Sequence, residues 1–244
     1  MKLDILAFGV HPDDIELSCA GTLLIEKGKG HKVGIVDLTR GELGTRGTAK
    51  TREEEARNSA KILQVDVREN LGMADGFFQN DKEHQIEIIK MLRKYRPEIV
   101  LCNAPEDRHP DHGRAAKLVE EAAFLSGLRK VETSLDNLLQ EAWRPKYIFN
   151  YIQDNYFDPD FVLDISSVIE KKKEAILAFK TQFYTGENNS DEPQTYISSP
   201  AFLDSVISRS AIWGKMIGVP YAEGFLTKKM IGIESFTSLI QNNT

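Results

Sequence analysis

The sequence predicts an α/β fold, in which a Rossmann-like, doubly wound and mostly parallel sheet is flanked by helices and followed by a helical C-terminal extension. Two observations support this prediction. Short apolar segments alternate with segments of helical periodicity from residue 3 to residue 150, as they do where crossover helices join parallel strands. Beyond residue 150, two long segments have the apolar spacing of helices, so a helical extension is expected to follow the sheet.

Five apolar segments are predicted to be the strands of this sheet. Each is short and is bounded by glycine, proline or polar residues, as buried parallel strands are. The third segment has the weakest pattern. In chain order the expected strands are residues 3–9, 32–38, 67–71, 98–102 and 146–150.

Six segments with apolar residues at helical spacing are predicted to be helices. The second is expected to begin at Thr51, because Thr51 and Glu54 have the spacing of a capping box. The third is expected to stop before Pro97, since proline interrupts helical hydrogen bonding. In chain order the expected helices are residues 13–29, 51–63, 81–95, 114–125, 165–179 and 200–217.

No internal repeat, low-complexity tract or linker divides the chain, so residues 1–244 are expected to form a single domain. Residues 185–193 are polar and lack hydrophobic periodicity, which predicts a loop that could act as a lid.

The composition argues against several classes of partner. The net charge is −6, so no broad basic surface for nucleic acid is expected. No apolar stretch approaches the ~20 residues of a membrane span. The two cysteines, Cys19 and Cys102, lie in apolar segments without a CxxC pair, which favours a reducing, cytoplasmic environment over a disulfide framework.

Two polar clusters follow the first and the fourth predicted strands. They are Gly9-Val10-His11-Pro12-Asp13-Asp14 and Asp107-Arg108-His109-Pro110-Asp111-His112. Ligands of open α/β sheets bind beyond the carboxyl ends of the strands, at the point where the strand order reverses. In the commonest arrangement that point lies between the first and fourth strands, so the two clusters are expected to meet.

The residue types in these clusters predict a catalytic metal site. Two imidazoles and one carboxylate leave a Zn²⁺ ion an open position for water. His11 and Asp14 are three residues apart at the start of a helix and can converge, and His112 is assigned as the third ligand. His109 could also bind metal, but a site with an open position needs only one more ligand from that segment. Zn²⁺ is the predicted cofactor, one per subunit, with Fe²⁺ as an alternative.

The remaining side chains of the clusters suit proton transfer. Asp13 could take a proton from the activated water, and His109 could stabilise an oxyanion opposite. Asp111 could orient His109 or His112. Each cluster also has an ordinary interpretation: His-Pro is often only a turn, and Asp13 or Asp14 could simply cap a helix. Three of the chain's five histidines lie in the two clusters, which favours the metal site.

The motifs at residues 7–14 and 109–112 resemble the LmbE-like, or PIG-L, family of zinc-dependent N-deacetylases, as do residues 39–42, 51–54 and 71–76. The resemblance implies that His11, Asp14 and His112 bind zinc, that Asp13 is the general base, and that His109 stabilises the oxyanion or acts as an acid. It also implies a Rossmann-like fold and homo-oligomers, often hexamers.

The C-terminal segments at residues 199–202, 213–214 and 218–225 look like the bacillithiol-pathway branch of that family. That branch removes the acetyl group from N-acetylglucosaminyl-malate, so the resemblance implies a small amino-sugar substrate. Mycothiol-pathway relatives carry a tyrosine just before the second histidine motif, where this chain has Asp107-Arg108. Tyr184 or Tyr196 could take over that role, or the role could be dispensable.

Four further residues are candidates for substrate binding. Arg52 either pairs with Glu55 or another acid in the first turn of its helix or clamps a substrate carboxylate. Asp75 and Glu42 either stabilise their loops or bind sugar hydroxyls. Arg108 is a candidate partner of a malate group.

The predicted activity is metal-dependent hydrolysis of an N-acetylglucosamine conjugate, with another N-acetylated sugar or small amide as alternative substrates. A Mg²⁺-dependent receiver-like domain is a second class, with Asp75 as phospho-acceptor, although the histidines would then have no role. A nucleotide-binding Rossmann protein is a third, but the first turn has no G-x-G-x-x-G pattern.

Overall fold

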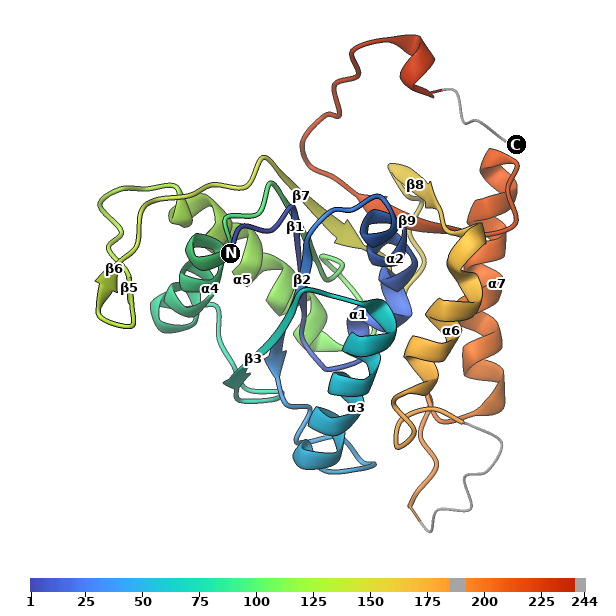
Figure 1. Ribbon diagram of the computed structural model, residues 1–244. Coiled ribbons are helices and arrows are strands. Elements are labelled where there is room, and N and C mark those ends of the chain that lie inside the picture. Colours follow the sequence, from blue (N-terminus) through green and yellow to red (C-terminus); the bar gives the residue numbers. More distant parts are fainter. Residues whose placement is uncertain (185–191, 240–244) are drawn as a thin grey trace.

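The computed structural model describes residues 1–184 and 192–239. Its centre is a seven-stranded sheet in the order β3-β2-β1-β4-β7-β9-β8, with helices on both faces (Figure 1). This is the predicted Rossmann-like class, and β1 and β4 are neighbours as expected. The sheet strands are β1 (Ile5–Gly9), β2 (Val33–Thr39), β3 (Val67–Met73), β4 (Ile99–Cys102), β7 (Tyr147–Tyr151), β8 (Phe161–Asp164) and β9 (Ala222–Leu226).

The helices alternate with the first strands and then follow them. They are α1 (Asp14–Ser18), α2 (Ala20–Gly28), α3 (Ala49–Leu63), α4 (Lys82–Tyr95), α5 (Pro110–Ser126), α6 (Ile169–Leu177) and α7 (Pro200–Ile217). Two 3₁₀ turns, η1 (Ser166–Val168) and η2 (Phe236–Leu239), and a small hairpin of β5 (Ser134–Leu135) and β6 (Leu138–Leu139) complete the described elements.

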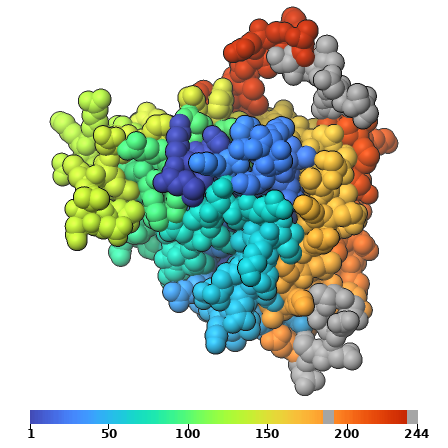
Figure 2. All heavy atoms as spheres, in the orientation of Figure 1, coloured from blue at the N-terminus to red at the C-terminus, as the bar shows by residue number. Residues whose placement is uncertain are grey.

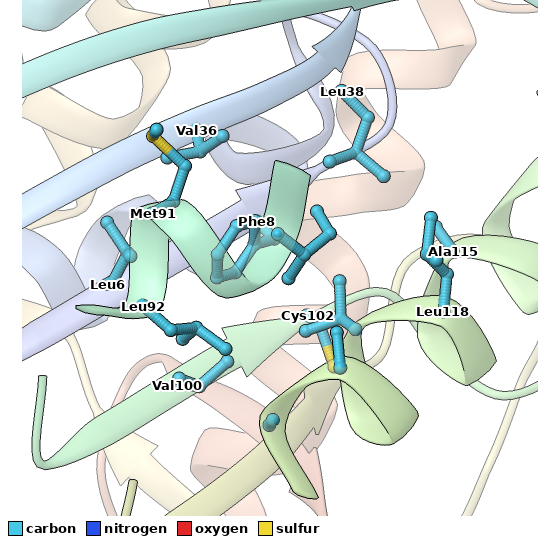
Figure 3. Close-up of a cluster of buried hydrophobic side chains, with 14 of the residues drawn as sticks. Leu6, Phe8, Val36, Leu38, Met91, Leu92, Val100, Cys102, Ala115 and Leu118 are labelled. Carbon is cyan, nitrogen blue, oxygen red and sulfur yellow. The ribbon is translucent and has the colours of Figure 1, made fainter. Parts of the chain in front are cut away.

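Alternate residues of β1 pack into two different cores. Leu6 and Phe8 contact a cluster that includes residues of α4 and α5, whereas Ile5 and Ala7 belong to a cluster with residues of α1, α2 and α6. Figure 3 shows the first cluster, where Leu92 of α4 and side chains of α5 lie against β1 and β4. Burial on both faces explains why β1 reads as a continuous apolar run.

One edge of the sheet differs from the sequence-based expectation. β9 pairs antiparallel with β7 and with β8, whereas the other pairs among β1, β2, β3, β4 and β7 are parallel. The apolar periodicity beyond residue 150 indicated only helices. These two strands are short, and they are separated in sequence by α6 and α7, so no local hairpin signal marks them.

The helix expected over residues 13–29 is broken at Cys19, which has φ −136° and ψ 16°. The break frees the N–H groups at the start of α2, and the carboxylate of Glu223 in β9 accepts hydrogen bonds from Gly21 and Thr22 at 2.9 and 2.7 Å. Lys172 of α6 pairs with the same carboxylate at 2.5 Å. Both charged side chains are 1% exposed, so this pair links three elements inside the protein.

Two other helices begin earlier than expected. α3 starts at Ala49 because Thr48, rather than Thr51, is its N-cap, and Thr51 supplies the reciprocal bond of the capping box. α5 starts at Pro110 with His109 as its N-cap, so the last four residues of the second polar cluster form the cap and the start of this helix. The helix expected over 165–179 is shorter at both ends, since residues 166–168 form the 3₁₀ turn η1 and α6 runs only from Ile169 to Leu177.

The space-filling view shows that residues 227–239 rise from the body of the protein (Figure 2). Within the described ranges, no helix combines the length and apolarity that crossing a membrane requires. Of the predicted loop at residues 185–193, positions 185–191 lie outside the described residues.

Candidate active site

The two polar clusters meet at the carboxyl ends of β1 and β4, as the strand order predicts. The two strands pair in parallel with Ala7 opposite Leu101, so the segments that follow them leave the sheet side by side. A cavity of about 300 Å³ opens there. Its lining includes His11, Asp13, Asp14, His109 and His112, so all five predicted metal and catalytic residues face one space.

Asp14 is the buried centre of the site, with 1% of its surface exposed. One carboxylate oxygen, Oδ2, accepts hydrogen bonds from the backbone N–H groups of Val10 and His11 at 2.9 and 3.0 Å and from Asn103 at 3.1 Å. The other, Oδ1, lies 2.8 Å from the Gln153 amide and 3.4 Å from His112 Nε2. Burial opposes ionisation, but the charge of His112 and these bonds hold the pKa of Asp14 well below its usual range.

His112 lies between two carboxylates. Its Nδ1 is 2.6 Å from Asp107 Oδ2, and its Nε2 faces Asp14. Burial favours the neutral ring, but the charge of Asp14 and the bond to Asp107 raise the pKa of His112 to about 10. Because Nδ1 is committed to Asp107, Nε2 is the nitrogen left to bind a ligand.

In His11 the two ring nitrogens have the opposite roles. Its Nε2 is 2.9 Å from Asp75 Oδ1, and its Nδ1 lies 3.9 Å from Asp14 Oδ2. The second oxygen of Asp75 accepts a hydrogen bond from the backbone N–H of Leu43 at 3.0 Å. Asp75, predicted as a sugar ligand or a loop residue, therefore orients His11 and leaves Nδ1 directed to Asp14.

The predicted donors are of types that bind a divalent ion, and one pair of them has the spacing of metal ligands. Two ligand atoms of a tetrahedral zinc lie about 3.3 Å apart, and the Asp14 Oδ1 to His112 Nε2 distance is 3.4 Å. A carboxylate bonded to the distal nitrogen of each histidine is the usual support of metal-binding imidazoles. Among the described residues, two other sets have ligand atoms that all lie within 4.8 Å of one another: His11, His109 and His112, and His11, Asp75 and Asp111. These two sets are the geometric alternatives to the predicted one.

Asp13 points to a different partner from its neighbour Asp14. Its side chain makes no capping bond to α1, which removes the helix-cap interpretation, and its Oδ2 lies 2.9 Å from Arg52. Its backbone has φ 145° and ψ −20°, a conformation that costs an L-residue roughly 1–3 kcal/mol. Burial raises the pKa of Asp13 to about 7, while the charge of Arg52 acts in the opposite direction.

His109 caps α5 with its ring. Its Nδ1 accepts a hydrogen bond from the backbone N–H of Asp111 at 3.3 Å, so Nε2 carries the proton of the neutral ring. Burial and the neighbouring histidines lower its pKa. The sequence allowed Asp111 to orient His109 or His112, but its carboxylate binds Arg114 at 2.7 Å and the Gly76 N–H at 2.8 Å.

The candidates for substrate binding differ in whether they line the cavity and in how exposed they are. Arg108 lines the cavity and remains 49% exposed, with its Nε 2.5 Å from Asp154 and its guanidinium 4.7 Å from the centre of the Tyr196 ring. Tyr196 also lines the cavity, whereas Tyr184 is not among its lining residues.

Arg52 lines the cavity too, but its side chain is only 5% exposed. Glu42 is not part of the lining. Its two carboxylate oxygens accept hydrogen bonds from the backbone N–H groups of Arg40 and Asp75, so it joins two loops beside the site.

Fold and site together define an α/β protein with a histidine and carboxylate centre at the point where the strand order reverses. Comparison with known proteins narrows this class. The PIG-L family model, described as GlcNAc-PI de-N-acetylase, matches residues 6–123. A diacetylchitobiose deacetylase from Thermococcus kodakarensis is 31% identical over 232 residues, which cover 90% of this chain and 81% of that protein.

Two further proteins are similar over most of the chain. A Bacillus subtilis protein described as "Probable N-acetyl-alpha-D-glucosaminyl L-malate deacetylase 2" is 27% identical over 199 residues, covering 75% of this chain and 84% of the relative. The crystal structure of a conserved protein from Thermus thermophilus matches with a TM-score of 0.85 and 35% identity, covering 96% and 98% of the two chains. The chain belongs to the PIG-L family of deacetylases, and the resemblance expected from its motifs is confirmed.

Proposed function

We propose that the protein is a metal-dependent hydrolase that removes the N-acetyl group from an N-acetylglucosamine conjugate. The observation that supports this most is the pair of carboxylates, Asp75 and Asp107, that turn His11 and His112 toward Asp14. Such outer carboxylates fix the ring orientation of metal-binding histidines. Asp13 and His109 then remain at the same cavity for proton transfer.

His11 Nδ1, Asp14 and His112 Nε2 would hold the ion. When bound, a Zn²⁺ or Fe²⁺ ion would lower the pKa of a water molecule and polarise the acetyl carbonyl. Asp13 accepts the proton of the attacking water as its oxygen bonds to the carbonyl carbon. The Nε2–H of His109 donates to the developing oxyanion. When the C–N bond breaks, a proton from Asp13 or His109 goes to the amine, which gives acetate and a free amino sugar.

N-acetylglucosaminyl-malate is the first candidate substrate. The C-terminal segments, the Bacillus relative and the exposed guanidinium of Arg108 at the cavity support it. N,N'-diacetylchitobiose is the second, because the Thermococcus relative has the higher identity. The receiver-like alternative is disfavoured, since its phospho-acceptor, Asp75, is bonded to His11. A cytoplasmic location, suggested by the buried free Cys19 and Cys102, and a homo-oligomer remain predictions.

The direct test is acetate release from N-acetylglucosaminyl-malate, N,N'-diacetylchitobiose and N-acetylglucosamine, each with and without a chelator. We expect release from at least one conjugate, with loss of activity after chelation and recovery after zinc is restored. If acetate is released fastest from N-acetylglucosaminyl-malate, the result would support the first candidate substrate. No release from any of the three compounds, or release that a chelator leaves unchanged, would contradict the proposed function.

A further inference from the structure

We propose that Arg52 is a positioning residue for the general base: its guanidinium fixes the Pro12–Asp13 peptide and the Asp13 carboxylate instead of binding substrate. Arg52 Nη2 donates to the Pro12 carbonyl at 2.6 Å and lies 2.9 Å from Asp13 Oδ2. One nitrogen therefore contacts both the backbone and the side chain of the turn that presents the base. This inference rests on the proposed function, because it assigns Asp13 the proton transfer.

Several contacts fix the position of the Arg52 guanidinium. Nη1 donates to Gln182 Oε1 at 3.2 Å. On another side, the backbone of Gly41 lies so close that an added Cβ would stand 2.9 Å from the guanidinium carbon. The side chain is 5% exposed. A guanidinium held in this way has one orientation, which it imposes on the turn it contacts.

The turn needs such a contact. Asp13 has φ 145°, a region that non-glycine residues leave unless surrounding contacts enforce it. Its carboxylate makes no capping bond to α1, so local helix geometry does not hold it. The ion pair with Arg52 supplies the missing restraint on this carboxylate, and it sets the direction in which the base faces the cavity.

The same contacts leave Arg52 poorly placed to clamp a substrate carboxylate. A bidentate pair needs two adjacent N–H groups on one edge of the guanidinium. Nη2, which belongs to both such edges, already contacts the Pro12 carbonyl and the Asp13 carboxylate. Nη1 donates to Gln182, and Nε is buried without a hydrogen-bond partner among the described residues. Arg108 is different, because its Nε contacts Asp154 while its side chain is half exposed. An anionic group of a substrate would therefore meet Arg108 first.

Gln182, which accepts the hydrogen bond of Arg52 Nη1, is itself held by its neighbours. Its amide Nε2 donates to the Arg46 carbonyl at 2.8 Å and contacts Thr181 Oγ1 at 2.9 Å. Thr181 is in turn bonded through its N–H and its hydroxyl to Glu55 of α3, at 2.7 and 2.9 Å. The segment after α6 is thus fastened to the helix that carries Arg52, and Gln182 acts on the base only through Arg52.

The two roles of Arg52 predict different kinetics. For Arg52→Gln, misplacement of the base should lower kcat by on the order of 10²-fold, to the same extent with an anionic and a neutral conjugate, and leave KM within a few-fold. A substrate clamp would instead raise KM for the anionic conjugate alone. Arg52→Lys should recover part of kcat, and Gln182→Ala should lower kcat by a smaller factor. Arg57→Gln, an exposed position of the same helix, is the matched control.

A double-mutant cycle tests whether Arg52 acts through Asp13. In the Asp13→Asn background, Arg52→Gln should change the residual kcat little. If the two residues acted independently, the kcat losses of the two substitutions would multiply. A crystal structure of Arg52→Gln should also show the Asp13 carboxylate turned from its wild-type position. A selective KM effect, multiplicative kcat losses or an unmoved Asp13 would each overturn the inference. Wild-type protein that releases no acetate would instead refute the proposed function, and the crystal structure would still decide the role of Arg52.

Discussion

Each histidine assigned to the metal has one ring nitrogen committed to a carboxylate. Asp107 takes Nδ1 of His112, and Asp75 takes Nε2 of His11. These contacts fix which nitrogen faces Asp14 and make the rings better ligands. Sequence spacing did not indicate the role of Asp75, because Asp75 reaches His11 from a loop 64 residues away. Asp107 is five residues from His112 in the same cluster, so for that pair a local signal was present.

Replacement of these carboxylates should weaken metal binding without abolishing it. We expect Asp107→Asn and Asp75→Asn each to lower zinc affinity by about 10–100-fold, since an outer partner is lost and all ligands remain. Zinc titration against a competing chelator measures the change. Asp81→Asn is a suitable control, because Asp81 binds His84 at the surface and should leave affinity unaltered. Unchanged affinity in both site variants would refute the orienting role.

Asp13 and Asp14 are adjacent in sequence, yet they contact different partners. Asp14 faces His112, and Asp13 faces Arg52. Asp13→Asn should therefore retain the metal and lose about 10²–10⁴-fold in kcat, the usual contribution of a general base. Elemental analysis and acetate release measured on the same preparation test both parts. Full activity would remove Asp13 from the mechanism, and loss of the ion would make it a ligand.

At the level of elements, the buried Lys172–Glu223 pair joins α6, β9 and the start of α2. Glu223→Ala would leave a buried lysine without its counter-charge and α2 without its cap, so we expect the free energy of unfolding to fall by about 3–5 kcal/mol. Denaturant unfolding measures the loss. Glu170→Ala removes an exposed partner of Lys173 and should cost under about 1 kcal/mol. Similar losses in the two variants would contradict the buried role.

The elements that sequence reasoning predicted well are those with strong local patterns. β1, β2 and β4 are apolar on both faces, and α4 has a regular apolar stripe ended by Pro97. The break at Cys19 was not foreseen, because the carboxylate that satisfies the N–H groups at the start of α2 belongs to Glu223, about 200 residues away. β8 and β9 were missed for the same reason: their pairing is set by tertiary contacts.

At the scale of the whole molecule, the strand order predicted the site, which motif spacing alone could not do. It brought together two clusters separated by about a hundred residues, because β1 and β4 are neighbours. The sequence could therefore predict which residues share the cavity. It could not predict that Arg52 would form an ion pair with Asp13. The choice between an ion pair within the protein and a substrate clamp depends on side-chain packing.

Metal binding should also stabilise the whole fold. An ion that binds only the folded state adds about 2.7 kcal/mol at a free concentration of one hundred times its Kd. We expect Zn²⁺ to raise the Tm of the metal-free protein, and Mg²⁺ to have little effect, since imidazole ligands favour zinc over magnesium. Thermal unfolding with each ion tests this. An equal shift with Mg²⁺ would favour an all-oxygen site.

The central claim is that His11, Asp14 and His112 hold the metal while His109 serves the reaction. The most direct measurement is the zinc content of His109→Ala and His112→Ala, purified in parallel with the surface variant His31→Ala. The account predicts about one ion per subunit in His109→Ala, with acetate release lost, and little or no zinc in His112→Ala. Zinc lost from His109→Ala and retained in His112→Ala would contradict it.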